Sequence, residues 1–176
     1  MTRKLLAVMA LLMVASLSVC GCTTSTTNTA TSPLPAHDAL LAKLVNATRQ
    51  EADANTSYKV ETWNVMWNNG TSVTILATLE ATSTGTPVAA NSTFVSFPTT
   101  QDATNYLNAF NKTSYSLTST DQSDASLIYY NSTGHPPSVY REYTYTEGSI
   151  LGGSVGVHEL IQYDNIIQTG TATATL

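Results

Sequence analysis

Two segments of alternating apolar and polar residues flank the turn sequence Asn68-Asn69-Gly70, and together they constrain the fold more than any other feature. Residues 58–67 and residues 71–80 both alternate, which is typical of strands whose successive side chains point to opposite faces. Asn-Gly is favoured in tight hairpin turns because both residues tolerate a positive φ. The pattern therefore predicts an antiparallel β-hairpin.

Two other segments have the spacing of amphipathic helices. Residues 37–54 carry their apolar side chains in one stripe: Leu40, Leu41, Leu44 and Val45. The second segment begins with Thr99-Thr100-Gln101-Asp102, a hydroxyl cap followed by an acid, as at many helix N-termini. The apolar residues after it are spaced i, i+3, i+4 and i+7: Ala103, Tyr106, Leu107 and Phe110. We expect both segments to be helices that pack on a sheet.

The rest of the pattern is mostly that of strands and turns. Strands are predicted over residues 93–97, 139–146, 154–163 and 166–175, with weaker candidates at 113–118 and 127–130. Residues 81–90 are rich in Thr, Gly and Pro and are expected to form a loop. Residues 37–176 have the length of one domain. The expected fold class is α+β, an antiparallel sheet of about six to eight strands with two amphipathic helices packed on one face.

The first 21 residues have the pattern of an export signal. Arg3 and Lys4 precede an uncharged apolar run over residues 5–19, which is shorter than the ~20 residues of a membrane-spanning helix. We therefore expect residues 1–21 to be a signal peptide. The alternatives are a plain secreted protein cleaved nearby and an uncleaved N-terminal anchor.

Val19-Cys20-Gly21-Cys22 resembles a lipobox, in which a small residue precedes the cysteine that becomes lipidated. Cys22 follows the small Gly21, whereas Cys20 would follow the larger Val19. We expect lipidation at Cys22, with Cys20 as the alternative, and attachment to the cell membrane on its extracytoplasmic side. Acyl or alkyl chains at one cysteine hold a protein stably when two or more are present.

Residues 22–36 are expected to be the lipidated cysteine and a disordered tether, because they are rich in Thr, Ser and Pro and have no apolar period. Beyond them, six Asn-x-Ser/Thr sequons are candidate glycosylation sites: Asn46, Asn55, Asn69, Asn91, Asn111 and Asn131. Asn69 and Asn131 lie beside glycine-bearing turns and are expected to be the most accessible. The leader, tether and sequons together resemble those of archaeal cell-surface lipoproteins.

Composition excludes several classes of function. The chain has a net charge of −5, and only 11% of its residues are charged. Nucleic-acid binding needs clustered Lys and Arg, so we expect no nucleic-acid partner. Both cysteines lie in the lipobox-like motif. The domain therefore has no internal disulfide, no thiolate nucleophile and no cysteine metal site.

The motifs that can carry catalysis or metal binding are weak. Gly152-Gly153-Ser154-Val155-Gly156 matches the nucleophile-elbow pattern, but a strand rather than a helix is predicted after the serine. His37, His135 and His158 have no metal-ligand spacing. Asp121 and Asp124 lack the other oxygens of a calcium loop. We therefore expect no catalytic residue, metal or cofactor.

The remaining candidates are aromatic residues on strands. Core packing is the ordinary role of such residues, and an exposed binding face for a glycan or another envelope protein is the alternative. The candidate residues are Trp63, Trp67, Tyr140, Tyr143 and Tyr145. We expect a membrane-tethered extracytoplasmic lipoprotein that acts as a non-enzymatic binding or scaffolding module. A small extracytoplasmic hydrolase is the alternative.

Overall fold

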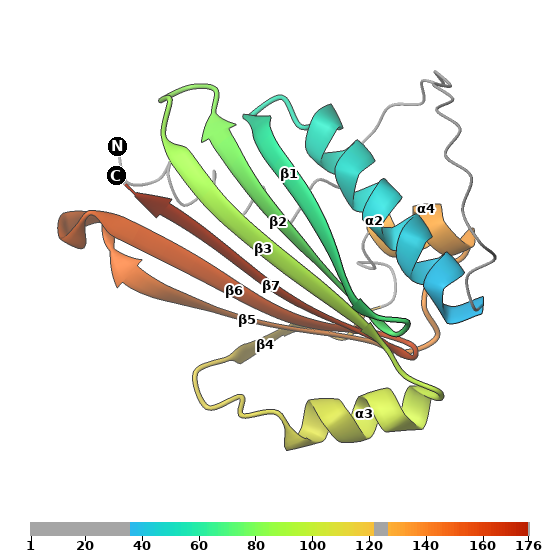
Figure 1. Ribbon diagram of the computed structural model, residues 1–176. Coiled ribbons are helices and arrows are strands. Elements are labelled where there is room, and N and C mark those ends of the chain that lie inside the picture. Colours follow the sequence, from blue (N-terminus) through green and yellow to red (C-terminus); the bar gives the residue numbers. More distant parts are fainter. Residues whose placement is uncertain (1–35, 122–126, 176) are drawn as a thin grey trace, which may run out of the picture.

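The computed structural model describes residues 36–121 and 127–175, with the side chains of residues 36–38 and 150 left aside. In this part of the chain, one antiparallel sheet of seven strands is covered by three helices (Figure 1). The strands are β1 (Tyr58–Asn69), β2 (Ser72–Ala81), β3 (Pro87–Ser96), β4 (Ser116–Ser119), β5 (Tyr140–Ser149), β6 (Ser154–Tyr163) and β7 (Ile166–Thr175). The helices are α2 (Ala36–Ala54), α3 (Thr100–Ala109) and α4 (Leu127–Thr133), and a 3₁₀ turn, η2, spans Ile150–Gly152. The predicted class, α+β with an antiparallel sheet, is confirmed.

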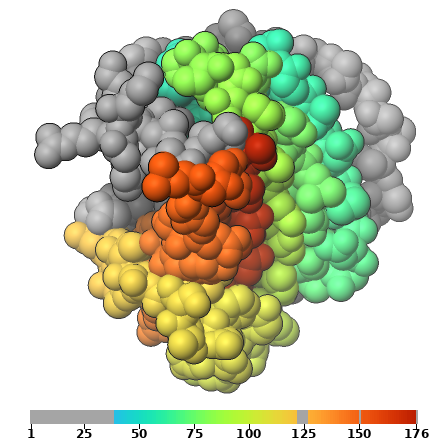
Figure 2. All heavy atoms as spheres, turned by 90° about the vertical axis from the view of Figure 1, so that its left-hand side faces the viewer, coloured from blue at the N-terminus to red at the C-terminus, as the bar shows by residue number. Residues whose placement is uncertain are grey.

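The strands lie in the order β1-β2-β3-β7-β6-β5-β4, so the strand that comes last along the chain lies in the middle of the sheet. Hairpins join β1 to β2, β2 to β3, β5 to β6 and β6 to β7, whereas the chain between the paired strands β4 and β5 contains α4, and β7 pairs with β3 across a long stretch of sequence. The register of that pair runs from Val88 opposite Ala174 to Ser96 opposite Ile166. Figure 2 shows β5 and β6 in orange beside β7 in dark red and the green strands.

Helices α2 and α4 cover one face of the sheet, which we call the α2 face. The register places the side chains of Val73, Phe94, Ile161 and Ile166 on this face. They form the main core with Leu41 and Leu44 of α2 and Tyr129 of α4. Since about 25 cal/mol is gained per Å² of apolar surface buried, this cluster is the main source of stability on this face.

Helix α3 covers the opposite face, which we call the α3 face. Its buried residues Ala103 and Leu107 pack on Leu160 of β6 and Ile167 of β7. The predicted helix N-terminus is confirmed, because the Thr99 hydroxyl accepts a hydrogen bond of 3.1 Å from the Asp102 N–H. The helix predicted around Ala103–Phe110 therefore does not share a face with α2. Figure 1 shows α3 below the sheet, apart from α2.

The place beside α2 is taken by α4, at residues 127–133, where a strand was expected at 127–130. A short apolar run does not distinguish a strand from a helix. Here the segment packs against α2, and this packing favours the helix. The Ser132 hydroxyl donates to the Ile128 carbonyl at 2.6 Å and the Thr133 hydroxyl to the Tyr129 carbonyl at 2.8 Å. The loop expected over residues 81–90 is also shorter, because β3 begins at Pro87, a position where a strand tolerates proline.

Candidate functional site

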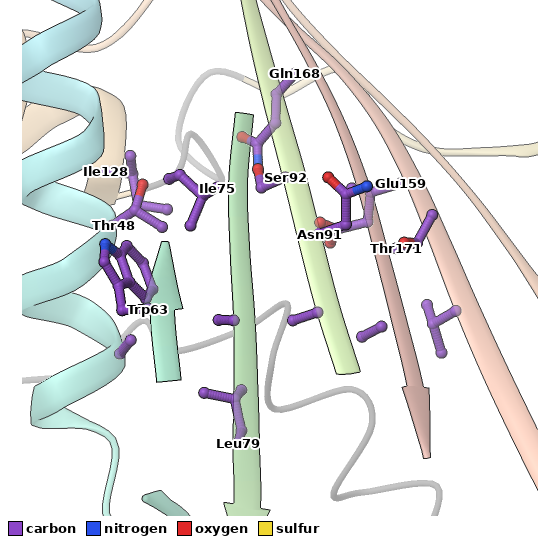
Figure 3. Close-up of a pocket in the computed structure, with 16 residues that line it drawn as sticks. Thr48, Trp63, Ile75, Leu79, Asn91, Ser92, Ile128, Glu159, Gln168 and Thr171 are labelled. Carbon is purple, nitrogen blue, oxygen red and sulfur yellow. The ribbon is translucent and has the colours of Figure 1, made fainter. Parts of the chain in front are cut away.

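A pocket of about 140 Å³ lies on the α2 face, between α2 and the sheet. It is next to the main core, along the same strands. Its lining comes from both helices of that face and from five strands. The lining residues are Thr48, Ala52, Trp63, Ile75, Ala77, Leu79, Ala90, Asn91, Ser92, Ile128, Val157, Glu159, Gln168, Gly170, Thr171 and Ala172. Figure 3 shows them spread from Thr48 and Trp63 beside α2 to Glu159 across the sheet.

The pocket exists because small residues occupy positions on the α2 face where the core has large ones. Farther along the same strands, the core is filled by Phe94, Ile161 and Ile166. At the pocket, Ala77 on β2 pairs with Ala90 on β3, and Ala90 pairs with Ala172 on β7. An engineered cavity of about 150 Å³ with an apolar lining binds benzene or xenon, so a space of this size can hold a small molecule.

Glu159 of β6 supplies the one acidic side chain in this lining. A Cβ added at Gly170 would lie 3.2 Å from Glu159 Oε2, so the glycine leaves room for the carboxyl group. No hydrogen bond or ion pair joins this carboxyl group to another residue that the structure describes. Desolvation by burial, with the nearby charges of Glu142 and Glu51, raises the pKa of Glu159 to about 7.

Two further carboxyl groups lie close to Glu159. Glu142 of β5 points to the α2 face and accepts a hydrogen bond of 2.6 Å from the Tyr140 hydroxyl. Glu51 lies on the sheet-facing side of α2, and its Oε2 atom is buried without a hydrogen-bond partner. Burial raises the pKa of Glu51 to about 7. Three half-buried carboxyl groups from α2, β5 and β6 are therefore close enough to influence one another's ionisation, and Glu159 is the one that lines the pocket.

The basic side chains of the described chain do not neutralise this region. Arg49 forms an ion pair of 2.8 Å with Asp53, and Lys59 forms one of 2.7 Å with Glu61. Arg141 and Lys112 make their contacts on the α3 face. Arg141 donates a hydrogen bond to Gln162, and the Lys112 ammonium group lies over the Tyr143 ring. The last of the five, Lys43, is exposed. No Lys or Arg that the structure describes therefore forms an ion pair with these three carboxyl groups.

Three other polar side chains at the pocket are already paired, those of Thr48, Ser92 and Gln168. The side chains of Asn91 and Thr171 lie on the opposite face of the sheet in this register. Gln168 Nε2 donates to the Ser92 hydroxyl at 3.2 Å, and Gln168 Oε1 accepts from the Tyr163 hydroxyl at 3.1 Å. The Thr48 hydroxyl donates to the Leu44 carbonyl at 2.8 Å. Glu159 is therefore the polar group in the pocket that is most able to bind a ligand.

The five aromatic residues singled out in the sequence do not form one surface. Trp63 lines the pocket beneath the Arg49 guanidinium, 5.3 Å from its ring centre, and Trp67 is exposed on the same edge strand. Tyr140 is buried in the main core on the α2 face. Tyr143 and Tyr145 point to the α3 face, where Tyr145 stacks on His158 at 4.2 Å. Binding through any of them stays a prediction.

The structure does not assemble a catalytic triad around Ser154. This residue begins β6 directly after Gly153, which has a φ of +80°, so the serine follows a hairpin turn and precedes a strand. His158 points to the same face, but its ring stacks on Tyr145 and its Nε2 lies 2.9 Å from Glu147 Oε1. Across the described residues, no three His, Cys, Asp or Glu side chains are placed to hold a metal ion. Asp124 lies outside the described residues.

The sequons lie mostly at the surface. Asn46, Asn69, Asn91, Asn111 and Asn131 are exposed, and Asn55 is half-buried. The Asn69 and Asn55 side chains each accept a backbone hydrogen bond of 2.9 Å, from Thr71 and Ser57, respectively. The geometry is therefore open to modification at five of the six positions, and their use stays a prediction.

The expected signal peptide, both cysteines and the expected tether up to residue 35 lie outside the described residues. Among the helices that are described, none is both long and apolar enough to cross a membrane. Comparisons with protein-family models, with curated proteins and with solved structures found no match.

The pocket and its acidic residues were not among the sequence predictions. One signal was present, since the side chains of β6 on the α2 face are Val155, Val157, Glu159, Ile161 and Tyr163. A single acid in an otherwise apolar series indicates either a strand end or a buried site. Glu51 and Glu142 gave no such signal, because only the packing of α2 on the sheet brings them to it.

Proposed function

We propose that this chain is a membrane-tethered, extracytoplasmic lipoprotein whose domain binds a small ligand in the pocket beneath α2. The tether rests on the lipobox-like sequence ending at Cys22 and on the Thr-rich segment after it. The binding function rests on one observation, an apolar pocket of about 140 Å³ that contains a carboxyl group with no partner among the residues that the structure describes. Largely apolar pockets with a few polar groups are the usual form of small-molecule sites.

The binding function is tested with a small neutral probe and a matched pair of variants. Ala90 lines the pocket, whereas Ala89, the preceding residue of β3, is exposed on the α3 face. We expect n-butanol to shift the NMR signals of pocket residues, including the Trp63 indole, in the full chain. Ala90→Leu should abolish these shifts because leucine fills the space, and Ala89→Leu should leave them unchanged. Equal binding to both variants would place the probe elsewhere.

The anchor is tested separately by metabolic lipid labelling. We expect label in the wild-type chain and none in Cys22→Ala, because the proposed attachment needs that thiol. Cys20→Ala should keep the label. Labelling that depends on Cys20 alone would move the attachment site, and labelling of neither cysteine would remove the anchor.

Glycosylation is tested by intact mass before and after glycosidase treatment. We expect mass losses that fall when the exposed Asn69 or Asn131 is replaced by Gln. An unmodified mass would show that the sequons are not used.

A further inference from the structure

We propose that the pocket beneath α2 selects a small organic cation, a primary alkylammonium group on a short apolar chain, with Glu159 as its counter-ion. This proposal rests on the proposed binding function and adds the chemical class of the ligand. Three observations carry it: the pocket's apolar lining, the position of Glu159, and the absence of a neutralising cation in the described part of the chain.

The apolar lining of the pocket favours a ligand with a short hydrocarbon chain. Ile75, Leu79 and Val157 contribute hydrocarbon surface, and the small residues Ala77 and Ala172 leave the space open. A bare metal ion is not suited to this lining, since hard cations prefer several oxygen ligands at one point. A chain of about four carbon atoms is comparable in size with the benzene that occupies cavities of this volume.

The carboxyl group of Glu159 and the two carboxyl groups near it favour a ligand with a positive charge. Glu159 points into the space left by Gly170, with Glu142 and Glu51 near enough to affect its ionisation. An ionised carboxylate in such a place is costly unless it is paired. An anion would add to the repulsion, whereas an ammonium group donates hydrogen bonds to the carboxylate and offsets its charge.

Binding of the cation is therefore coupled to loss of a proton from Glu159. The groups that face it are Glu142 on β5 and Glu51 on α2, and no Lys or Arg that the structure describes joins them. Burial holds the pKa of Glu159 near 7, so the carboxyl group is mostly protonated at about pH 5 and mostly ionised at about pH 8. Affinity for the cation should rise over this range.

The test compares three probes of similar shape, n-butylammonium, n-butanol and n-butyrate, by NMR titration of the full chain. We expect n-butylammonium to bind at least about tenfold more tightly than n-butanol at about pH 8, and this ratio to shrink at about pH 5. n-Butyrate should bind most weakly. Glu159→Gln should remove the preference for the cation while n-butanol still binds.

The control is Glu80→Gln, which makes the same change of charge at an exposed position on β2. Glu80→Gln should keep the cation preference, because Glu80 does not line the pocket. If the preference came only from the net charge of the protein, both variants would lower it equally. Equal binding of n-butanol and n-butylammonium, no pH dependence, or a preference that survives Glu159→Gln would overturn the cation proposal and leave the binding function standing. If no probe binds, both proposals fail.

Discussion

Glu159 occupies a position on β6 whose neighbours on the same face are aliphatic or aromatic. Its raised pKa, near 7, means that the folded state holds a proton that the unfolded state releases near 4.5. The stability from this group is therefore complete below the unfolded pKa and is lost as the pH rises through the folded pKa. Glu51 has a raised pKa and acts in the same direction.

We predict that the free energy of unfolding falls between about pH 5 and about pH 8, by on the order of a few kcal/mol. Glu159→Gln should reduce this fall, because the amide has no charge to desolvate. Urea denaturation at several pH values measures both effects. Glu80→Gln serves as the control on the exposed surface, and a fall of equal size in both variants would contradict the role of Glu159.

Asp164 is a second residue whose chemistry is specific to its position. It turns the chain between β6 and β7 with a φ of +49°, a conformation that Asn and Asp tolerate better than other side chains. Its carboxylate accepts hydrogen bonds of 2.8 Å from the Val139 N–H and 2.9 Å from the hydroxyl of the buried Tyr129. The turn is therefore tied to both α4 and the start of β5.

We predict that Asp164→Ala costs about 2–4 kcal/mol of stability, because it removes two acceptors and strains the backbone. Asp164→Asn should cost less, since asparagine tolerates the same φ and keeps one carbonyl oxygen. The midpoints and slopes of urea unfolding give both values. Equal losses in the two variants would mean that the two features asparagine keeps, the tolerance of a positive φ and one acceptor oxygen, contribute nothing.

Among the elements, α3 shows most clearly how a local signal fixes a boundary. The Thr99 hydroxyl accepts a hydrogen bond from the Asp102 N–H and donates one to the Asp102 carboxylate at 2.7 Å. The helix therefore begins where the capping pattern in the sequence predicts. We predict that Thr99→Ala costs about 1 kcal/mol, the usual value of a helix cap. Thermal unfolding is the measurement.

The control for this prediction is Gln101→Ala in the exposed first turn of the same helix. Its side chain only reaches Asn105, at 2.9 Å, and alanine favours the helix. The stability of this variant should stay within about 0.5 kcal/mol of the wild type. A larger loss at Gln101 than at Thr99 would refute the capping argument.

Local patterns predicted the elements better than their arrangement. The hairpin of β1 and β2, the strands β6 and β7 and the extent of α2 follow from alternation and spacing, which act within a few residues. The turn itself differs from the expected Asn-Gly form, because it consists of Gly70 and Thr71 and neither Asn69 nor Gly70 has a positive φ. The opposite placement of α2 and α3 depends on which strand faces are apolar after the long-range pairing of β3 with β7. The pocket was beyond prediction for the same reason, because its small residues become neighbours only in that register.

At the scale of the whole molecule, β7 joins two halves of the sheet. It pairs with β3 on one side and with β6 on the other, so its backbone groups are used on both edges. Strand β4, in contrast, pairs only with β5 and contains an irregular register near Thr118. The two strands therefore differ in how strongly they tolerate a lost N–H donor.

We predict that Thr169→Pro in β7 costs about 3 kcal/mol or more, since proline removes a ladder hydrogen bond in a central strand. Thr118→Pro in the edge strand β4 should cost clearly less. Circular dichroism during urea unfolding compares the two. A larger loss at Thr118 than at Thr169 would contradict the strand order.

The central position of β7 also has a consequence for when the protein can fold. Ribosomes make the chain from its N-terminus, so β1 to β6 emerge before the strand that must lie between β3 and β6. The strands β1 to β3 cannot be joined to β6 and β5 in one sheet until β7 is available. Contacts between residues so far apart in sequence form slowly. The nascent chain therefore lacks its complete sheet through most of its synthesis, an incompletely folded state that the export proposed above would also need.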